Sequence, residues 1–140
     1  MTISIDSSLI AALLDDDHTM NRVAVKVLGR LSARERLVVS GIDYVELMAG
    51  RLRDEESLNL FFADTGIEID WAMGEAMWRE AGRAYRGYAT RRKKSGGGDV
   101  RRILTDFLIG AHALARGYAL LTLNSEDFRT AFPALRIISA

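Results

Sequence analysis

Residues 102–128 constrain the fold more than any other stretch of the sequence. Apolar side chains occupy almost every turn from Leu104 to Ala115, so a helix here has almost no polar face and must be covered on most sides. Gly110, small and in the middle of this helix, would allow close approach to a sheet. Gly117 is placed to end the helix, and residues 118–123 form a short, continuous apolar run typical of a buried parallel strand. The pattern predicts a buried helix followed by a buried strand, closed by a polar turn at residues 124–127.

Shorter segments of the same two kinds alternate along the rest of the chain. Runs with strand character cover residues 2–5, 37–39, 67–69 and 135–138. Apolar residues at helical spacing cover residues 9–14, 23–31, 42–48, 51–64 and 71–92. The glycine-rich residues 93–100 predict a loop. This alternation predicts a single α/β domain over residues 1–140 with a mainly parallel sheet, because right-handed crossovers need the intervening helices.

Composition excludes several kinds of site. The 140 residues include no cysteine, which excludes disulfides, zinc–thiolate sites and thiol nucleophiles. No cationic segment precedes an N-terminal apolar run, and no apolar run reaches about 18 residues, so we expect a cytoplasmic protein without a membrane span. Residues 1–78 carry seven basic and fourteen acidic side chains, whereas the remainder carry twelve and five. We therefore expect a polarised surface that suits an anionic partner.

Four acidic residues occupy equivalent places relative to the predicted elements. Asp6 follows the first strand, Glu46 lies one turn into the helix after the second, Asp106 begins the buried helix, and Asp127 follows the fourth strand. The carboxyl ends of parallel strands form one crevice, so we expect these side chains to converge there. Each acid taken alone is better explained as a helix cap or an exposed residue, but this explanation weakens for four acids that line one crevice. Four together repel one another unless they hold protons or bind a cation.

A hard divalent cation would relieve that repulsion. Oxygen ligands without a thiolate or a nearby histidine favour Mg²⁺ or Mn²⁺ over zinc. Two such ions about 3.5 to 4 Å apart can activate a water molecule and stabilise the leaving oxygen during phosphodiester cleavage. The acids therefore predict a metal-dependent hydrolase that needs no protein nucleophile.

The order and spacing of these motifs also carry a resemblance. They read Ile5-Asp6-Ser7-Ser8, then Glu46, then Asp106-x-x-Ile109-x-Ala111-x-Ala113, and finally Leu121-Thr122-x-Asn124-x-x-Asp127-Phe128. This set resembles the PIN-domain ribonucleases of the VapC toxin type. The resemblance implies a three-layer α/β/α sandwich with a mainly parallel five-stranded sheet. It also implies that Asp6, Glu46, Asp106 and Asp127 are the catalytic, metal-binding acids, supported by Ser7, Thr122 and Asn124. Asp43, an additional acid before Glu46, leaves open which acid of that helix points inward.

The resemblance further implies a function. It predicts a Mg²⁺- or Mn²⁺-dependent endoribonuclease that acts as the toxin of a toxin–antitoxin pair, forms a homodimer and is silenced by a cognate antitoxin. The alternative is a catalytically silent PIN-like module that binds metal, RNA or a partner. A haloacid-dehalogenase-like phosphatase is set aside because Ser8 stands where that class needs its second aspartate. A receiver-like signalling module is set aside because no lysine follows a late strand.

Basic residues gather in one segment before the buried helix. Residues 79–102 hold nine of the nineteen basic side chains, which suits contact with phosphates, although a solvated helix face is the simpler reading. The residues that we predict to bind RNA are Arg91, Arg92, Lys93, Lys94, Arg101 and Arg102. Tyr85 and Tyr88 lie among them and could stack on an unpaired base.

Trp71, Trp78 and Tyr85 recur at about two helical turns, which indicates core or a helix–helix seam rather than a partner groove.

Overall fold

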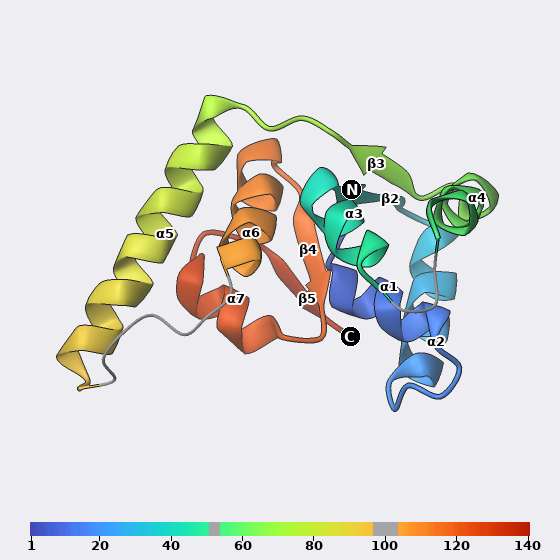
Figure 1. Cartoon of the computed structure of the whole chain (residues 1–140), viewed down its shortest axis with the longest axis horizontal. Coiled ribbons are helices and arrows are strands. Elements are labelled where there is room, and N and C mark those ends of the chain that lie inside the picture. Colours follow the sequence, from blue (N-terminus) through green and yellow to red (C-terminus); the bar gives the residue numbers. More distant parts are fainter. Residues whose placement is uncertain (51–53, 97–103) are drawn as a thin grey trace.

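The computed structural model describes residues 1–50, 54–96 and 104–140, in which strands and helices alternate along the chain (Figure 1). The elements of these described residues are β1 Thr2–Ile5, α1 Ser7–Leu14, α2 Asn21–Ser32, β2 Arg36–Ser40, α3 Gly41–Met48, α4 Glu55–Thr65, β3 Glu68–Asp70, α5 Glu75–Lys94, α6 Leu104–Arg116, β4 Ala119–Thr122, α7 Ser125–Ala131 and β5 Ile137–Ser139. All five predicted strands are present, and most of their ends differ from the predicted ends by one or two residues.

The strands form one sheet with the order β3-β2-β1-β4-β5, and every neighbouring pair is parallel. The predicted α/β class is confirmed, and the described sheet is parallel throughout rather than mainly so. The chain builds outward from β1 to β3 on one side and then returns to build β4 and β5 on the other side. The order therefore reverses between β1 and β4, and in open parallel sheets the crevice at such a point is where ligands bind.

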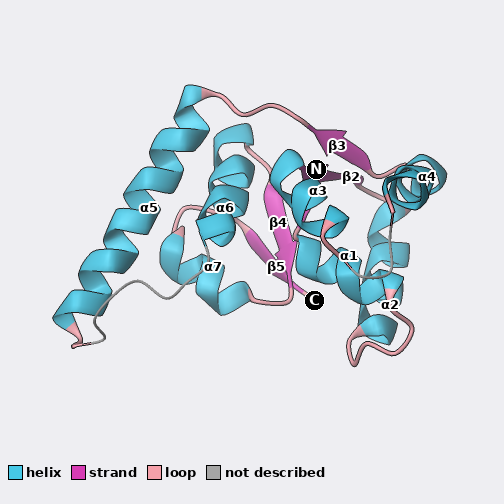
Figure 2. Ribbon diagram, in the orientation of Figure 1, coloured by secondary structure: helices cyan, strands magenta, loops and turns pink. Residues whose placement is uncertain are grey.

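Helices cover both faces of the sheet, which gives the predicted three layers (Figure 2). On one face, Leu9 of α1, Leu28 of α2 and Leu58 of α4 join the same buried cluster as Leu121 of β4. On the other face, Leu120 joins a second cluster together with α5, α6 and α7, whose buried members include Met77, Phe107 and Phe128. Successive β4 side chains thus enter opposite cores, as period-2 alternation in a doubly covered strand requires.

The apolar helix α6 is buried as its sequence predicts. Phe107 on one side of the helix, and Ile109 and Ala113 on the opposite side, are fully buried. Gly117 ends the helix with φ of 74°. The close approach at Gly110 is made to Phe132 after α7, not to the sheet, because a Cβ atom there would lie 2.3 Å from the Phe132 ring. No helix in the described part of the chain is long and apolar enough to cross a membrane.

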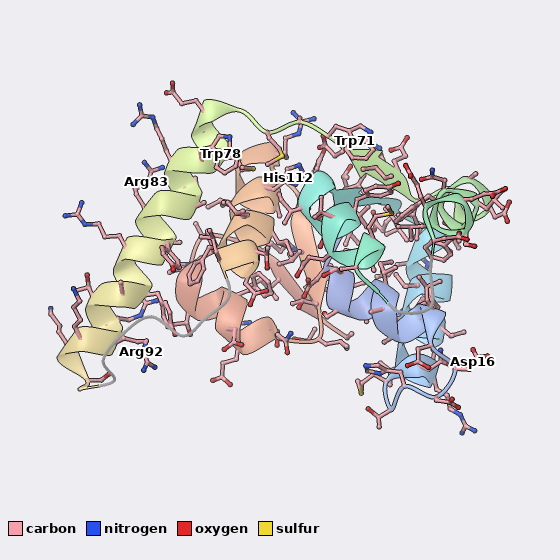
Figure 3. All side chains as sticks on the ribbon, viewed as in Figure 1. Asp16, Trp71, Trp78, Arg83, Arg92 and His112 are labelled. Atoms are coloured by element: carbon pink, nitrogen blue, oxygen red, sulfur yellow. The ribbon has the colours of Figure 1, made fainter. Side chains whose placement is uncertain are left out.

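Several predicted elements are wrong at their boundaries. The helix predicted over residues 51–64 begins at Glu55 as α4, and residues 51–53 lie outside the described residues. The loop predicted over residues 93–100 begins only after Lys94, and residues 97–100 lie outside the described residues. The helix expected from residue 71 begins only at Glu75, because Gly74 occupies the N-cap position in an extended conformation. Trp71 instead packs its ring edge against Tyr44, with centroids 5.3 Å apart, and it is 62% exposed, while Trp78 on α5 is 51% exposed (Figure 3). The predicted seam therefore does not include these two tryptophans. Residues 124–127 are also not a simple turn, since α7 begins at Ser125.

Asp70 connects the end of β3 to α6 and β4. Its Oδ2 atom accepts hydrogen bonds from Tyr118 Oη at 2.7 Å and Arg116 Nε at 2.8 Å, while Oδ1 accepts from the Ala72 backbone at 3.0 Å. The ring of His112, which is fully buried, lies 3.7 Å from the same carboxylate. Burial alone would raise the pKa of Asp70, but these hydrogen bonds outweigh it and lower the pKa to about 2.

Removing the Tyr118 hydroxyl should therefore cost stability at neutral pH. We expect Tyr118→Phe to lower the free energy of unfolding by about 2 kcal/mol, the usual contribution of a hydrogen bond to a charged group. A depressed carboxyl pKa stabilises the fold above pH 3.8 and ceases to do so as the pH falls to about 2, so the difference should shrink over that range. Denaturant unfolding at pH 7 and pH 2.5 measures both effects.

Tyr44→Phe is the matched control for this prediction. The Tyr44 hydroxyl donates to the amide oxygen of Asn59 at 2.9 Å in an exposed position, so its loss should cost less than about 1 kcal/mol at either pH. Equal losses in the two variants would contradict a special role for the Asp70 contacts.

Candidate active site

A pocket of about 310 Å³ opens at the carboxyl edge of the sheet, beside the point where the strand order reverses. Its lining residues are Asp6, Ser7, Ser8, Ala11, Glu46, Leu47, Asp106 and Asn124. They come from the β1–α1 junction, α1, α3, the first turn of α6 and the residue before α7. The structure thus brings three of the four predicted acids to one pocket.

Asp6 lies at the floor of this pocket and is only 2% exposed. The backbone N–H of Asp6 donates to the Leu121 carbonyl at 2.9 Å, so the β1–β4 pairing extends to this residue. Its Oδ2 atom accepts hydrogen bonds from Thr122 Oγ1 at 2.7 Å and Ser8 Oγ at 2.9 Å. Although Asp6 occupies the N-cap position of α1, its side chain accepts no capping hydrogen bond. The carboxylate is therefore held by two hydroxyls and does not serve as a helix cap.

Glu46 is held from both sides by hydroxyl donors. Its Oε1 atom accepts from Ser7 Oγ at 2.9 Å, and its Oε2 atom accepts from Thr105 Oγ1 at 3.2 Å. Ser7 begins α1 and Thr105 lies in the first turn of α6, so this one side chain of α3 links the two other elements that carry pocket acids. Sequence reasoning missed Thr105; its position next to Asp106 was the available signal.

Asp43 is the acid of α3 that points away from the pocket and into the protein. It is completely buried, and it forms a capping box with Ser40, in which each residue's side chain accepts a hydrogen bond from the other's backbone N–H. Its Oδ1 atom accepts from the Ser7 backbone N–H at 2.8 Å. The spacing Ser40-x-x-Asp43 before an apolar helix is the sequence signal of such a cap. Of the two acids of α3, Glu46 lines the pocket and Asp43 does not.

Burial shifts the titration of Asp43. Loss of solvent, followed by the nearby charge of Asp6, raises the pKa of Asp43 to about 7 even though hydrogen bonds from Ser40 and Ser7 oppose the rise. The folded protein therefore holds a proton there between pH 3.8 and about 7, where the unfolded chain has released it. A raised carboxyl pKa stabilises the fold below this window, and the stabilisation is lost as the pH rises through it.

This shift predicts a stability that falls toward neutral pH. In chelator-containing buffer, the free energy of unfolding should decrease by up to about 4 kcal/mol more in the wild type than in Asp43→Asn between pH 4 and pH 8. Urea unfolding at four pH values in this range measures the two slopes. Parallel curves for the two proteins would show that Asp43 titrates normally.

The third and fourth predicted acids differ in their placement. Asp106 is partly buried in the first turn of α6 and lines the pocket. Asp127 is exposed in the first turn of α7 and is not among the lining residues, whereas Asn124 is. The backbone N–H of Asn124 donates to Thr122 Oγ1 at 3.0 Å, the same hydroxyl that donates to Asp6. The predicted supporting residues Ser7, Thr122 and Asn124 therefore all lie at the pocket or contact an acid in it.

Comparison with known proteins agrees with this architecture. The PIN domain family matches the chain over residues 3–132. This chain belongs to the PIN domain family. The comparison with curated proteins found no match.

Solved structures share the PIN fold over nearly their whole length. VapBC-1 from nontypeable Haemophilus influenzae has 24% identity and a TM-score of 0.71, with 99% of this chain and 98% of that chain covered. VapBC2 from Rickettsia felis, bound to a DNA fragment from its promoter, has 18% identity and a TM-score of 0.66, with 99% and 98% covered. A toxin–antitoxin complex from Klebsiella pneumoniae has 17% identity and a TM-score of 0.63, with 97% and 95% covered.

PIN domains generally use a divalent metal ion, and the donors in this pocket suit one. Asp6, Glu46 and Asp106 supply carboxylate oxygens, and Asn124 adds an amide, the ligand set that Mg²⁺ and Mn²⁺ prefer. The pocket thus fits a hard cation by the chemistry of its donors. Within the described residues, however, no three His, Asp or Glu side chains are grouped closely enough to hold a metal ion.

Seven of the nineteen basic residues of this PIN domain lie along α5. Arg91, Arg92, Lys93 and Lys94 form its last turn, which projects from the rest of the molecule, away from α1 and α3 (Figure 1). Cations there also complement the negative end of the helix dipole. Figure 3 shows Arg83 projecting from the outer side of the same helix, where it pairs with Glu80. Arg101 and Arg102 lie outside the described residues.

The predicted base-stacking role of two tyrosines is not supported by their packing. Tyr85 packs edge-on against Phe107 with ring centroids 5.1 Å apart, and Tyr88 contacts the same ring at 5.5 Å. Both rings therefore help to hold α5 on α6. The spacing of the aromatic residues indicated a helix–helix contact correctly at these two positions.

Proposed function

We propose that this PIN domain is a divalent-metal-dependent endoribonuclease and the toxin of a VapC-type toxin–antitoxin pair. The observation that carries the proposal is the convergence of Asp6, Glu46 and Asp106, from three separate elements, on one pocket at the switch point of the sheet. Carboxylates gathered in one partly buried site need a positive partner. A divalent metal ion would satisfy that need, and the bound ion would in turn attract an RNA phosphate, which gives hydrolysis a physical basis.

Neighbouring hydroxyl groups hold two of the pocket acids, Asp6 and Glu46, in place. Ser8 and Thr122 orient the carboxylate of Asp6, and Ser7 and Thr105 orient that of Glu46. Asp106 enters from the buried helix α6, whose packing leaves it little freedom to move. Mg²⁺ or Mn²⁺, when bound, would supply Lewis-acid stabilisation and lower the pKa of water. Asp127, three residues after Asn124, is the fourth proposed acid.

RNA would be bound largely through its phosphates. Arg91, Lys93 and Lys94 are exposed on α5, and Arg92 beside them is partly buried. With Arg101 and Arg102, they form a basic segment that connects α5 to the helix bearing Asp106. Each phosphate that such residues neutralise adds salt-dependent affinity without sequence selectivity.

The proposed partners are a cognate antitoxin and a second copy of the chain. The structural neighbours include VapBC proteins and a toxin–antitoxin complex, which supports the antitoxin part of the proposal. Exposed apolar side chains such as Val45, Trp71 and Trp78 offer surface for association. Size-exclusion chromatography with light scattering, on the chain alone and after co-expression with a candidate antitoxin, tests both partners.

Cleavage of RNA is the experiment that tests the activity. The wild type and Asp106→Asn would be incubated with total cellular RNA and Mg²⁺ or Mn²⁺, with and without a chelator, and the new RNA ends sequenced. The proposal predicts discrete cuts that disappear with the chelator and in the variant. Equal patterns for both proteins would contradict it. RNA binding without cleavage by the wild type would instead identify the catalytically silent module.

A further inference from the structure

Asp43 accepts hydrogen bonds from two separate segments, the start of α3 and the start of α1. Its Oδ2 atom accepts from the backbone N–H of Ser40 at 2.9 Å and from Ser40 Oγ at 2.7 Å, which fixes the start of α3. Its Oδ1 atom accepts from the backbone N–H of Ser7 at 2.8 Å, at the start of α1 and 36 residues away in sequence. The capping box of α3 needs only the first of these oxygens. The second is therefore available to hold α1.

The N–H groups of Ser7 and Leu9 at the start of α1 find acceptors other than the Asp6 side chain. The first N–H groups of a helix need acceptors, and an aspartate at the N-cap is usually one of them. In α1, the N–H of Ser7 is taken by Asp43, and that of Leu9 is taken by the Asp6 backbone carbonyl at 3.0 Å. The Asp6 carboxylate accepts from Ser8 and Thr122 hydroxyls and lines the pocket.

The same link positions a second pocket acid. Ser7 donates its N–H to Asp43 and its hydroxyl to Glu46, and both acceptors belong to α3. One short segment, Asp6 and Ser7, is thereby fixed against α3 at two points one helical turn apart. Displacement of Ser7 would move Asp6 and release Glu46 together.

We propose that Asp43 is a positioning residue of the site, which sets the relative placement of Asp6 and Glu46 by anchoring the α1 and α3 N-termini to each other. The inference rests on the proposed function, because its consequence is the geometry of the metal-binding acids. A carboxylate is required, since both of its oxygens accept hydrogen bonds. An amide accepts through only one oxygen, so Asp43→Asn can satisfy Ser40 or Ser7 but not both.

The main test is Mn²⁺ binding, measured by electron paramagnetic resonance titration at pH 8 on the full chain. We expect Asp43→Asn to weaken Mn²⁺ binding at least fivefold and to lower kcat for RNA cleavage at least tenfold, with KM for RNA unchanged. Asp54→Asn is the matched control, because Asp54 caps α4 by accepting from Ser57 N–H at 2.7 Å and is exposed outside the pocket. It should lose thermal stability without any change in Mn²⁺ binding or kcat.

A second pair of variants tests the same link without altering Asp43. Ser7→Ala removes only the hydroxyl that Glu46 accepts, whereas Ser7→Pro also removes the N–H that Asp43 accepts. Proline is suited to this first helical position, and the φ of −65° and ψ of 140° at Asp6 are compatible with a following proline. We expect Ser7→Pro to bind Mn²⁺ at least threefold more weakly than Ser7→Ala.

The outcomes separate this inference from the proposed function. The first case is a wild type that binds Mn²⁺ and cleaves RNA. If Asp43→Asn then binds Mn²⁺ as tightly as the wild type, and Ser7→Pro as tightly as Ser7→Ala, Asp43 is only a helix cap and the inference is wrong. If the wild type binds Mn²⁺ without cleaving RNA, the binding data alone decide the role of Asp43. If the wild type binds no Mn²⁺, the proposed function fails and the inference fails with it. If Asp43→Asn does not fold, the comparison of Ser7→Pro with Ser7→Ala decides whether Asp43 positions the site.

Discussion

Asp6→Asn is expected to lower the rate of RNA cleavage at least about 100-fold while the protein stays folded. Loss of residues that merely orient a metal ligand usually costs 10- to 100-fold in metal affinity or activity, so loss of a ligand itself should cost more. The asparagine oxygen can still accept from Ser8 and Thr122, which should preserve the local structure. Its neutral amide also removes the charge that faces buried Asp43. Single-turnover cleavage and thermal unfolding measure the two properties.

Two other substitutions serve as comparisons for Asp6→Asn. Asp64→Asn changes an exposed acid on α4, outside the pocket lining, and should leave cleavage unchanged. Asp127→Asn tests the acid that does not line the pocket, and a loss comparable to that of Asp6→Asn would establish it as a fourth member of the site. Full activity of Asp6→Asn would contradict the assignment of this pocket.

Gly110→Val is expected to give the largest loss of stability, about 3 kcal/mol or more. A Cβ atom at Gly110 would lie 2.3 and 2.6 Å from two carbons of the Phe132 ring, far inside van der Waals contact. Phe132 is itself buried, so its ring cannot move without opening the contact between α6 and α7. Overpacking of this kind costs about 1 to 3 kcal/mol, and a β-branched side chain adds further atoms to the clash.

Gly82→Ala is the matched control, because Gly82 also lies in the middle of a helix but has no atom within 4 Å of its missing Cβ. Alanine there should raise the free energy of unfolding by about 0.5 to 1 kcal/mol, the usual difference in helix propensity. Urea denaturation of both variants tests the pair. Stabilisation by both substitutions would contradict the close packing of α6 against Phe132.

The fold and much of the pocket could be predicted because parallel sheets impose strong rules. Short β-prone runs ending in Asp6 or preceding Glu46 place these acids near the carboxyl ends of strands, where a single crevice must form. The apolar character of α6 similarly predicts burial, which makes Asp106 near its start conspicuous. The predicted class, the strand positions and the meeting of these three acids all follow from that reasoning.

The errors arose where one sequence pattern fits two structures. Trp71 lies at helical spacing from Trp78, but Gly74 between them begins the helix instead of continuing it. Residues 124–127 contain polar residues that suit either a turn or the first turn of a helix, and the apolar Phe128 behind them packs into the core and favours the helix. Local patterns could not decide these cases because tertiary packing selects between the alternatives.

Buried polar partners were the least predictable part of the site. Asp43 stands between Ile42 and Tyr44 and resembles any exposed acid of a surface helix, yet it is completely buried. Its burial depends on Ser7, which is distant in sequence and close only in the folded chain. Thr105 likewise reaches Glu46 across 59 residues. Such contacts follow from the register of three elements, which a single sequence does not specify.

The most direct test of the central claim is to locate Mn²⁺ in the protein. An anomalous difference map, from crystals grown with MnCl₂, would show where the ion binds. We expect a peak in the pocket, in contact with the carboxylates of Asp6 and Asp106, and no such peak in Asp106→Asn. A peak confined to the other acidic surface at Asp54, Glu55 and Glu56, or no peak in the pocket at saturating Mn²⁺, would contradict the claim that this pocket is a metal-dependent active site.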